Sequence, residues 1–200
     1  MTKIKICGLT DRKEAEYLNR NQVDFAGFVL FYEKSKRNVT IARAKEIMVA
    51  LEPSIKTVAV VVSPTEDQVK EIAAAGFDYV QIHGQLQPGV LDHLPVLKAF
   101  NISDMDQYDT FQNCPGIAGY VFDAAEPGSG KTFDWNLLKT LPRGDKLFLL
   151  AGGLTAENVK EAIRYVEPDG VDVSSGVEFS DRSGKDPERV DAFVKSVRES

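Results

Sequence analysis

The feature that most constrains the fold of this chain is a regular alternation of short apolar segments with longer amphipathic ones. Eight segments have the apolar, often β-branched composition of buried strands, and helical patterns separate them. These segments are Lys3–Cys7, Asp24–Leu30, Lys56–Val62, Tyr79–Ile82, Val96–Phe100, Ile117–Phe122, Leu147–Leu150 and Val171–Val173. Strict alternation predicts parallel strands joined by right-handed crossovers. We therefore predict an α/β fold, a (β/α)8 TIM barrel that forms a single domain over residues 1–200, with an open doubly wound sheet as the alternative.

Capping residues indicate where several helices begin. Asp11, followed three residues later by Glu14, predicts one capping box, and Ser63 with Glu66 predicts another, with Pro64 at the first helical position. We expect the other helices to begin at Thr40, near Leu86–His93, and at Ser103, Asp134, Thr155 and Asp186.

Composition narrows the classes of partner. The formal net charge of -6 argues against a nucleic-acid partner, because binding to phosphate backbones depends on clustered Lys and Arg. The two cysteines, Cys7 and Cys114, form no CxxC motif, and no His lies at ligand spacing, so we expect neither a metal site nor a redox motif and favour a reducing compartment. No long apolar run is present, so we expect a cytoplasmic protein with no membrane partner. The sequence predicts no particular oligomeric state.

Two strand ends carry side chains suited to proton transfer. In a (β/α)8 barrel the loops after the strands converge on one mouth, which is where catalytic residues lie. Cys7 ends the first segment and Asp123 follows the sixth. A thiol acts as a base when nearby cations lower its pKa from about 8.5, and a carboxyl group can donate a proton. The alternatives are a buried, inert Cys7 and an Asp123 that caps a loop or pairs with a cation.

Glycine-rich turns follow the seventh and eighth segments. The first contains Gly152 and Gly153, and the second contains Ser174, Ser175 and Gly176. Glycine lets backbone N–H groups approach an anion, and these two loops of a barrel commonly bind phosphate. A phosphorylated small-molecule substrate is therefore predicted, although either turn alone is equally consistent with a merely tight connection.

Three further polar residues are candidates for substrate contacts. Arg37, in the loop after the second segment, has the geometry to bind a carboxylate in bidentate fashion, or it is simply solvated. His83 and Asp172 lie at the end of the fourth segment and in the eighth, where each either contacts a ligand or hydrogen-bonds within the barrel. Residues 128–132 resemble a nucleotide-binding P-loop, but Ala125 stands where that motif requires glycine, so we reject a nucleotide site.

Taken in order, these motifs resemble those of the phosphoribosylanthranilate isomerase family. The resemblance covers nearly the whole chain and rests on residues 5–10, 28–39, 81–84, 128–135, 151–154 and 171–178, of which the cysteine opening and the GKTFDW block are the most specific. It departs at Gln22, where a glycine is common, and at Asn38, where an aromatic residue is expected.

The resemblance implies an Amadori rearrangement of N-(5'-phosphoribosyl)anthranilate that uses no cofactor. It makes Asp123 the acid and Cys7 the base, assigns the anthranilate carboxylate to Arg37, and places the phosphate on the backbone around Gly153, Ser175 and Gly176. The alternatives are another phosphate-binding barrel such as indoleglycerol-phosphate synthase, a binding module without chemistry, and an isomerase that also accepts an aminoimidazole sugar phosphate.

Overall fold

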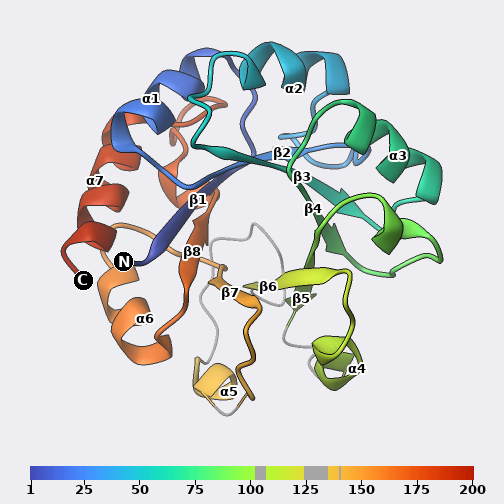
Figure 1. Cartoon of the computed structure of the whole chain (residues 1–200). Coiled ribbons are helices and arrows are strands. Elements are labelled where there is room, and N and C mark those ends of the chain that lie inside the picture. The colour runs from blue at the N-terminus through green and yellow to red at the C-terminus, as the bar shows by residue number, and fades with distance from the viewer. Residues whose placement is uncertain (102–106, 124–134, 140) are drawn as a thin grey trace.

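The computed structural model describes residues 1–101, 107–123, 135–139 and 141–200 of the chain. Eight parallel strands form a closed barrel, in which each strand pairs with the next and the last pairs with the first (Figure 1). The strands are β1 (Lys3–Cys7), β2 (Phe25–Val29), β3 (Lys56–Val62), β4 (Tyr79–His83), β5 (Val96–Asn101), β6 (Ile117–Asp123), β7 (Leu147–Leu150) and β8 (Gly170–Val173). The predicted (β/α)8 barrel is confirmed, and the open sheet is wrong because β8 pairs with β1.

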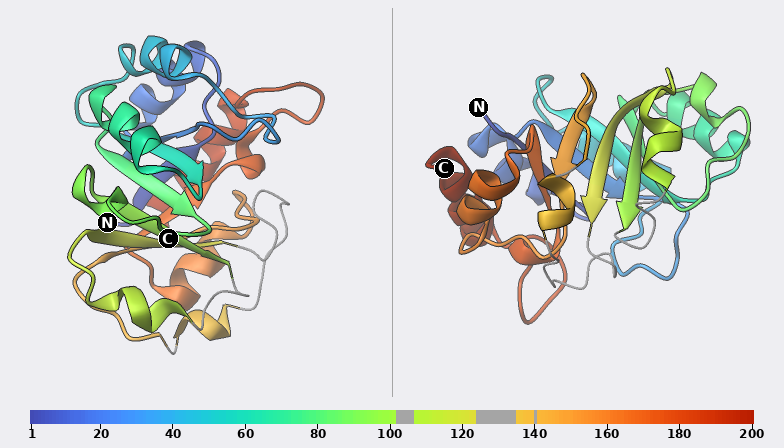
Figure 2. Two further views of the ribbon diagram at one scale, coloured as in Figure 1. Left: turned by 90° about the vertical axis from the view of Figure 1, so that its right-hand side faces the viewer. Right: turned by 90° about the horizontal axis from the view of Figure 1, so that it is seen from below.

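Helices surround the strands on the outside (Figures 1 and 2). The α-helices are α1 (Lys13–Asn21), α2 (Ile41–Met48), α3 (Glu66–Ala74), α4 (Tyr108–Gln112), α5 (Asn136–Lys139), α6 (Val159–Val166) and α7 (Pro187–Arg198). Among the described residues, the 3-10 turns η1 (Val90–Asp92) and η3 (Ser175–Val177) follow β4 and β8. The helix expected near Leu86–His93 is thus only one 3-10 turn, and the starts expected at Ser103 and Asp134 lie outside the described residues. Within the described residues, no helix has the length and apolar character needed to cross a membrane.

The alternation of side chains along β1 determines what faces the barrel interior. Ile4 and Ile6 belong to the large apolar cluster shared with the surrounding helices, so they point outward. Cys7 belongs to the smaller cluster inside the barrel, together with residues of β2, β3, β5, β6 and β7. Because neighbouring side chains on a strand point to opposite faces, Lys5 also points inward, beneath Cys7.

Strand register brings distant residues together at the mouth. Lys5 pairs with Asp172 across the junction of β1 and β8, and Cys7 pairs with Gly27 across the junction of β1 and β2. On the other side, Asn101 pairs with Asp123 across β5 and β6. Each pair lies at or near the carboxyl ends of its strands, so the register itself positions the candidate residues around one opening.

The helix starts differ from the prediction at α1, α3 and α6. α6 begins at Val159 rather than at Thr155, because the Asn158 side chain accepts from the Thr155 backbone and closes a turn before the helix.

α3 begins after Thr65, whose hydroxyl accepts from the Gln68 backbone while the Gln68 side chain accepts from the Thr65 backbone. The expected box from Ser63 is therefore wrong, because the overlapping Thr65–Gln68 pattern forms instead. Ser63 has φ of 45° and its hydroxyl accepts from the Gln85 backbone, which joins the ends of β3 and β4.

The start of α1 is also displaced. The helix begins at Lys13 after Arg12. Half of the predicted box forms, because the Asp11 backbone donates to the Glu14 side chain, whereas the Asp11 side chain accepts from the Lys13 backbone instead of that of Glu14. Glu14 points back and accepts from the backbone N–H groups of Thr10 and Asp11. By contrast, Thr40 and Asp186 cap α2 and α7 as predicted.

Both departures from the family pattern have a local structural role. Gln22 ends α1 with φ of 48°, a left-handed conformation that glycine adopts without strain, which explains why glycine is common there. The Asn38 side chain accepts a hydrogen bond of 2.8 Å from the Tyr32 backbone, so it closes the loop that carries Arg37.

Candidate active site

The carboxyl ends of the strands surround a cavity of about 410 Å³. Nearly all the site residues predicted from the sequence line it: Cys7, Arg37, His83, Asp123, Gly152, Gly153, Asp172, Ser174 and Ser175. Gly176 is the exception, since it borders an adjacent hollow with residues of the loop after β7 and of α7. The structure therefore brings together side chains from the first, second, fourth, sixth, seventh and eighth βα units.

Cys7 lies almost buried at the cavity wall, with 8 % of its surface exposed. Gly27 on β2 makes room for it, because a Cβ at that position would lie 2.9 Å from Cys7 Sγ. Burial raises the pKa of the Cys7 thiol, and the ammonium groups of Lys5 and Lys185 oppose that rise only in part. Nearby cations are thus present, but burial outweighs them, so the pKa of the Cys7 thiol lies above its ordinary value.

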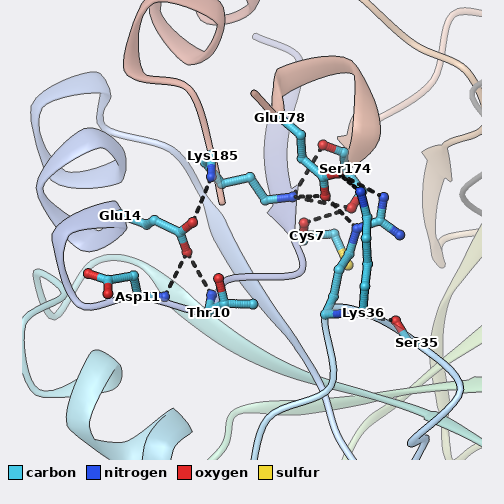
Figure 3. A network of polar contacts seen from close by, with 10 residues as sticks. Cys7, Thr10, Asp11, Glu14, Ser35, Lys36, Ser174, Glu178 and Lys185 are labelled. Atoms are coloured by element: carbon cyan, nitrogen blue, oxygen red, sulfur yellow. Dashed lines mark hydrogen bonds and ion pairs between the residues drawn. The ribbon is translucent and has the colours of Figure 1, made fainter. Parts of the chain in front are cut away.

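Arg37 is positioned by a buried carboxylate that sequence analysis did not single out. Arg37 donates from Nε to Glu178 Oε1 at 2.5 Å and from Nη2 to Glu178 Oε2 at 3.2 Å. Lys36 and Lys185 also contact Glu178, at 2.8 Å and 3.1 Å. Figure 3 shows Lys36, Glu178 and Lys185 of this cluster beside Cys7 and Ser174. Burial alone would raise the pKa of Glu178, but hydrogen bonds from Arg37 and Lys36 and the charge of Lys185 lower it to about 2.

The cluster leaves part of the Arg37 guanidinium facing the cavity. Arg37 lines the cavity whereas Glu178 does not, so the carboxylate engages the arginine from behind. Gly8, with φ of 82°, lets the arginine stem cross the turn after β1, because a Cβ there would lie 2.5 Å from Arg37 Cδ. The Nη1 edge is the part of the guanidinium that Glu178 leaves for a second anion.

The two glycine-rich loops contact each other directly. Gly152 and Gly153 have φ of 84° and 64°, so this turn adopts a left-handed conformation suited to glycine. A Cβ on Gly176 would lie 2.0 Å from the Leu154 carbonyl oxygen, so only glycine permits the approach of the two loops. Ser174 donates from Oγ to the Cys7 carbonyl at 2.9 Å, which attaches the second loop to the end of β1.

His83 is neutral in this cavity. Its Nε2 lies 3.0 Å from Gln81 Nε2, and burial together with the charges of Lys5 and Lys98 lowers its pKa to about 4. A neutral imidazole exchanges hydrogen bonds with a ligand but does not provide a positive charge for an anion.

Unpartnered acceptors surround the floor of the cavity. Asp172 accepts one hydrogen bond on Oδ2, from Lys5 at 2.8 Å, while its Oδ1 has no hydrogen-bond partner among the described residues. Within the part of the chain that the structure describes, Gln81 Oε1 and Asn101 Oδ1 are likewise buried acceptors without a partner, and both residues line the cavity. Buried polar atoms are normally satisfied, so these oxygens indicate positions where ligand donors bind.

The sequence alone did not indicate that six further residues belong to the site or its walls: Lys5, Gly27, Gln81, Asn101, Glu178 and Lys185. A usable signal existed for Lys5, since a lysine two residues before Cys7 must share its inward face. Lys185 offers none, because its contact with Glu178 depends on how the loop before α7 folds back. Among the described residues, no group of three or more His, Cys, Asp or Glu side chains is arranged to hold a metal ion.

Comparison with known proteins identifies the relatives of this chain. Residues 4–196 match the family model of N-(5'-phosphoribosyl)anthranilate (PRA) isomerase. The N-(5'-phosphoribosyl)anthranilate isomerase of Geotalea daltonii is 40 % identical over 207 residues, covering 100 % of this chain and 98 % of the relative. That of Streptococcus mutans is 39 % identical over 202 residues, covering 99 % of this chain and 100 % of the relative.

Solved structures agree with these sequence matches. The crystal structure of phosphoribosyl anthranilate isomerase from Thermotoga maritima superposes with a TM-score of 0.86 at 33 % identity, covering 100 % of both chains. A phosphoribosyl anthranilate isomerase in complex with reduced 1-(o-carboxyphenylamino)-1-deoxyribulose 5-phosphate superposes with a TM-score of 0.83 at 31 % identity, again covering 100 % of both chains.

Proposed function

This chain belongs to the N-(5'-phosphoribosyl)anthranilate isomerase family, and on that premise we propose that it isomerises N-(5'-phosphoribosyl)anthranilate to 1-(2-carboxyphenylamino)-1-deoxyribulose 5-phosphate in tryptophan biosynthesis. The observation that carries the proposal is that Cys7 and Asp123, on β1 and β6, line the same cavity as Arg37 and the glycine-rich loops. Residues 1–200 then act as one catalytic domain.

Acid and base perform the reaction in sequence. Asp123 donates a proton to the ribose ring oxygen, so that the C1–O bond breaks and a protonated Schiff base forms. The Cys7 thiolate then removes the proton from C2, which gives an enolamine, and tautomerisation of the enolamine gives the ketone. Each step moves only protons and electron pairs within the substrate, so the reaction requires no cofactor.

The cavity offers a distinct environment for each part of the substrate. The Nη1 edge of Arg37 binds the anthranilate carboxylate, and the nearby apolar surface of Val29, Val60 and Val62 packs against the aromatic ring. The backbone of Gly152, Gly153, Ser174, Ser175 and Gly176 binds the phosphate. This assignment makes the phosphorylated sugar span the cavity between Arg37 and the two loops.

The sugar itself lies over the unpartnered acceptors. Its hydroxyl groups donate to Asp172 Oδ1, Gln81 Oε1 and Asn101 Oδ1, the buried acceptors that lack a partner among the described residues. His83 contributes a further neutral hydrogen bond at the same level.

We infer that the enzyme acts in the cytoplasm. The proposed base is a thiol, and both Cys7 and Cys114 are free in the structure. A reducing compartment keeps such a thiol available for proton transfer.

A fluorescence assay tests the proposed function. The substrate is generated in place by a transferase that joins anthranilate to phosphoribosyl pyrophosphate, and the loss of anthranilate fluorescence is followed with and without the protein. We expect the protein to accelerate the decay well above the spontaneous rate, and we expect reduced 1-(o-carboxyphenylamino)-1-deoxyribulose 5-phosphate to inhibit it competitively. A folded protein that neither accelerates the decay nor binds the reduced compound would refute the proposal.

A further inference from the structure

Lys5 is a fully buried cation inside the barrel. Its side chain is 0 % exposed, and Nζ donates to Asp172 Oδ2 at 2.8 Å. Because an unpaired ammonium in the interior is costly, the pairing with Asp172 explains why Lys5 stays charged, and its pKa lies above the ordinary value: Asp172 and Cys7 together outweigh the effect of burial. The proposed proton transfers leave this cation without a role.

Gly27 allows Lys5 and Cys7 to approach each other. A Cβ at Gly27 would lie 2.9 Å from Cys7 Sγ and 3.2 Å from Lys5 Nζ, so the sulfur and the ammonium are neighbours at the same point of β2. Register supports this arrangement, since Gly27 pairs directly with Cys7 across β1 and β2. Because glycine has no side chain, nothing at position 27 separates the sulfur from the ammonium.

Three charged groups, Lys5, Asp172 and Lys185, act on the Cys7 thiol from three sides. Lys5 comes from β1 and Asp172 from β8, while Lys185 comes from the segment between η3 and α7 together with its partner Glu178. The ammonium of Lys185 already contacts Ser174 O, Ser174 Oγ and Glu178 Oε1. Its three donors are therefore engaged.

Lys5 differs from Lys185 in this respect. In the described part of the chain, the one oxygen to which Lys5 Nζ donates is Asp172 Oδ2. An ammonium has three donors, so donor capacity remains on the side of Lys5 that faces Cys7. This makes Lys5 the cation suited to interact with a negative sulfur.

We propose that Lys5 is a positioning residue for the reaction, whose ammonium stabilises the Cys7 thiolate while Asp172 fixes Lys5 in place. The inference rests on the proposed function, because a base role for Cys7 requires a thiolate at the cavity wall. Lys5 itself transfers no proton and does not touch the substrate. It acts through Cys7, by offsetting the burial that favours the neutral thiol.

Thiol alkylation tests the proposal independently of turnover. In a Cys114→Ser background, the rate at which iodoacetamide modifies Cys7 is measured by mass spectrometry as a function of pH. We expect the midpoint of this profile to rise by about one pH unit or more in Lys5→Met, which is the usual effect of removing a close opposite charge. Lys3→Met is the matched control, because Lys3 lies on the same strand, is half exposed and pairs with Asp24; its midpoint should stay at the parent value.

A double variant keeps the test decisive if Lys5→Met alone does not fold. Lys5→Met leaves Asp172 as an unpaired buried carboxylate, whereas Lys5→Met/Asp172→Asn removes both charges. Lys5 lowers the pKa of Cys7 more than Asp172 raises it, so the double variant should also show a raised midpoint. An unchanged midpoint in the folded double variant would overturn the proposal.

The pH profile of kcat/KM distinguishes a failure of the proposed isomerase function from a failure of the proposed role of Lys5. If the proposed function holds, the acid limb of the profile should move upward with the alkylation midpoint in both Lys5 variants. If the protein does not isomerise the substrate, the proposed function fails while the alkylation result still decides the role of Lys5. Normal turnover with an unmoved acid limb would reject Lys5 and leave the function intact.

Discussion

Two opposite walls of the barrel are built from different chemistry. The wall of β8, β1 and β2, which we call the charged wall, contains the Lys5–Asp172 pair and the cluster of Arg37 and Lys185 around Glu178. The wall of β5, β6 and β7, which we call the aromatic wall, is backed by rings whose centroids lie 4.4 to 6.2 Å apart. These rings belong to Phe100, Tyr108, Phe111, Tyr120, Phe122 and Phe148.

The two walls differ in whether the same residues stabilise the fold and form the site. On the charged wall, the groups that hold the loops together also surround Cys7 and orient Arg37. On the aromatic wall, the rings pack behind the strands, while Asp123 faces the cavity from the end of β6. A substitution on the charged wall should therefore alter both properties, whereas one behind the aromatic wall should alter stability alone.

The largest expected loss of kcat comes from replacing the proposed acid or base, of which each wall carries one. Cys7→Ala and Asp123→Asn should each lower kcat by about 10²–10⁴, the usual contribution of one positioned acid or base, while the fold persists. Steady-state kinetics in the fluorescence assay would measure this, with circular dichroism as the control for folding. Full turnover in either variant would show that the substituted residue is not the acid or base. Only one of the two walls would then provide a proton-transfer group.

Removal of a ring should separate stability from chemistry on the aromatic wall. Phe148 is 3 % exposed and its ring centroid lies 4.4 Å from that of Phe122. Phe148→Ala should lower the free energy of unfolding by about 3–5 kcal/mol through cavity formation, with kcat of the folded enzyme retained. Urea titration gives the first quantity and kinetics below the transition the second. A large loss of kcat in the folded protein would contradict the separation.

Acid should weaken the charged wall selectively. The pKa of Glu178 is about 2 in the folded protein against 4.5 ordinarily, so its contribution is complete above about pH 4.5 and is lost as the pH falls toward 2. The difference in unfolding free energy between wild type and Glu178→Gln should thus shrink by about 2 kcal/mol from pH 6 to pH 3. The cost of Phe148→Ala over the same range serves as the control and should stay constant. A Glu178 difference that also stays constant would show that the carboxylate does not titrate as proposed.

The smallest expected effect concerns substrate binding at the charged wall. Arg37→Ala should raise KM by about tenfold to a hundredfold, the equivalent of a lost charge-assisted hydrogen bond of about 1.5–3 kcal/mol, with a lesser effect on kcat. A substrate analogue without the carboxylate should be bound equally by wild type and variant. If KM for the full substrate does not change, the carboxylate lies elsewhere in the cavity.

The barrel could be predicted because its determinants are local. Each strand is a short apolar run, and its period, length and spacing are visible in the sequence without knowledge of its neighbours. Helix starts were less predictable where two capping patterns overlap, as at Ser63 and Thr65, because only tertiary contacts decide between them. The hydroxyl of Ser63 bonds to the Gln85 backbone, a contact that no local pattern reveals.

The site was predictable to the extent that strand ends define it. Cys7, His83 and Asp123 could be placed around one opening because parallel strands bring their carboxyl ends together, and all three line the cavity. The partners of Arg37 were not found, since Glu178 and Lys185 are distant in sequence and meet it only after the barrel closes. Ion pairs between residues distant in sequence produce no periodic pattern in the sequence. The orientation of Arg37 could therefore not be predicted without the three-dimensional structure.

One buried carboxylate, that of Glu14 in α1, joins the loop after β1 to the segment before α7. Glu14 is 3 % exposed and accepts from the backbone N–H groups of Thr10 and Asp11 through one oxygen and of Lys185 through the other (Figure 3). Local opening of either loop must break the shared contacts. The amide hydrogens of Thr10, Asp11 and Lys185 should therefore exchange with solvent deuterium in a single cooperative event, although the chain separates them by most of its length.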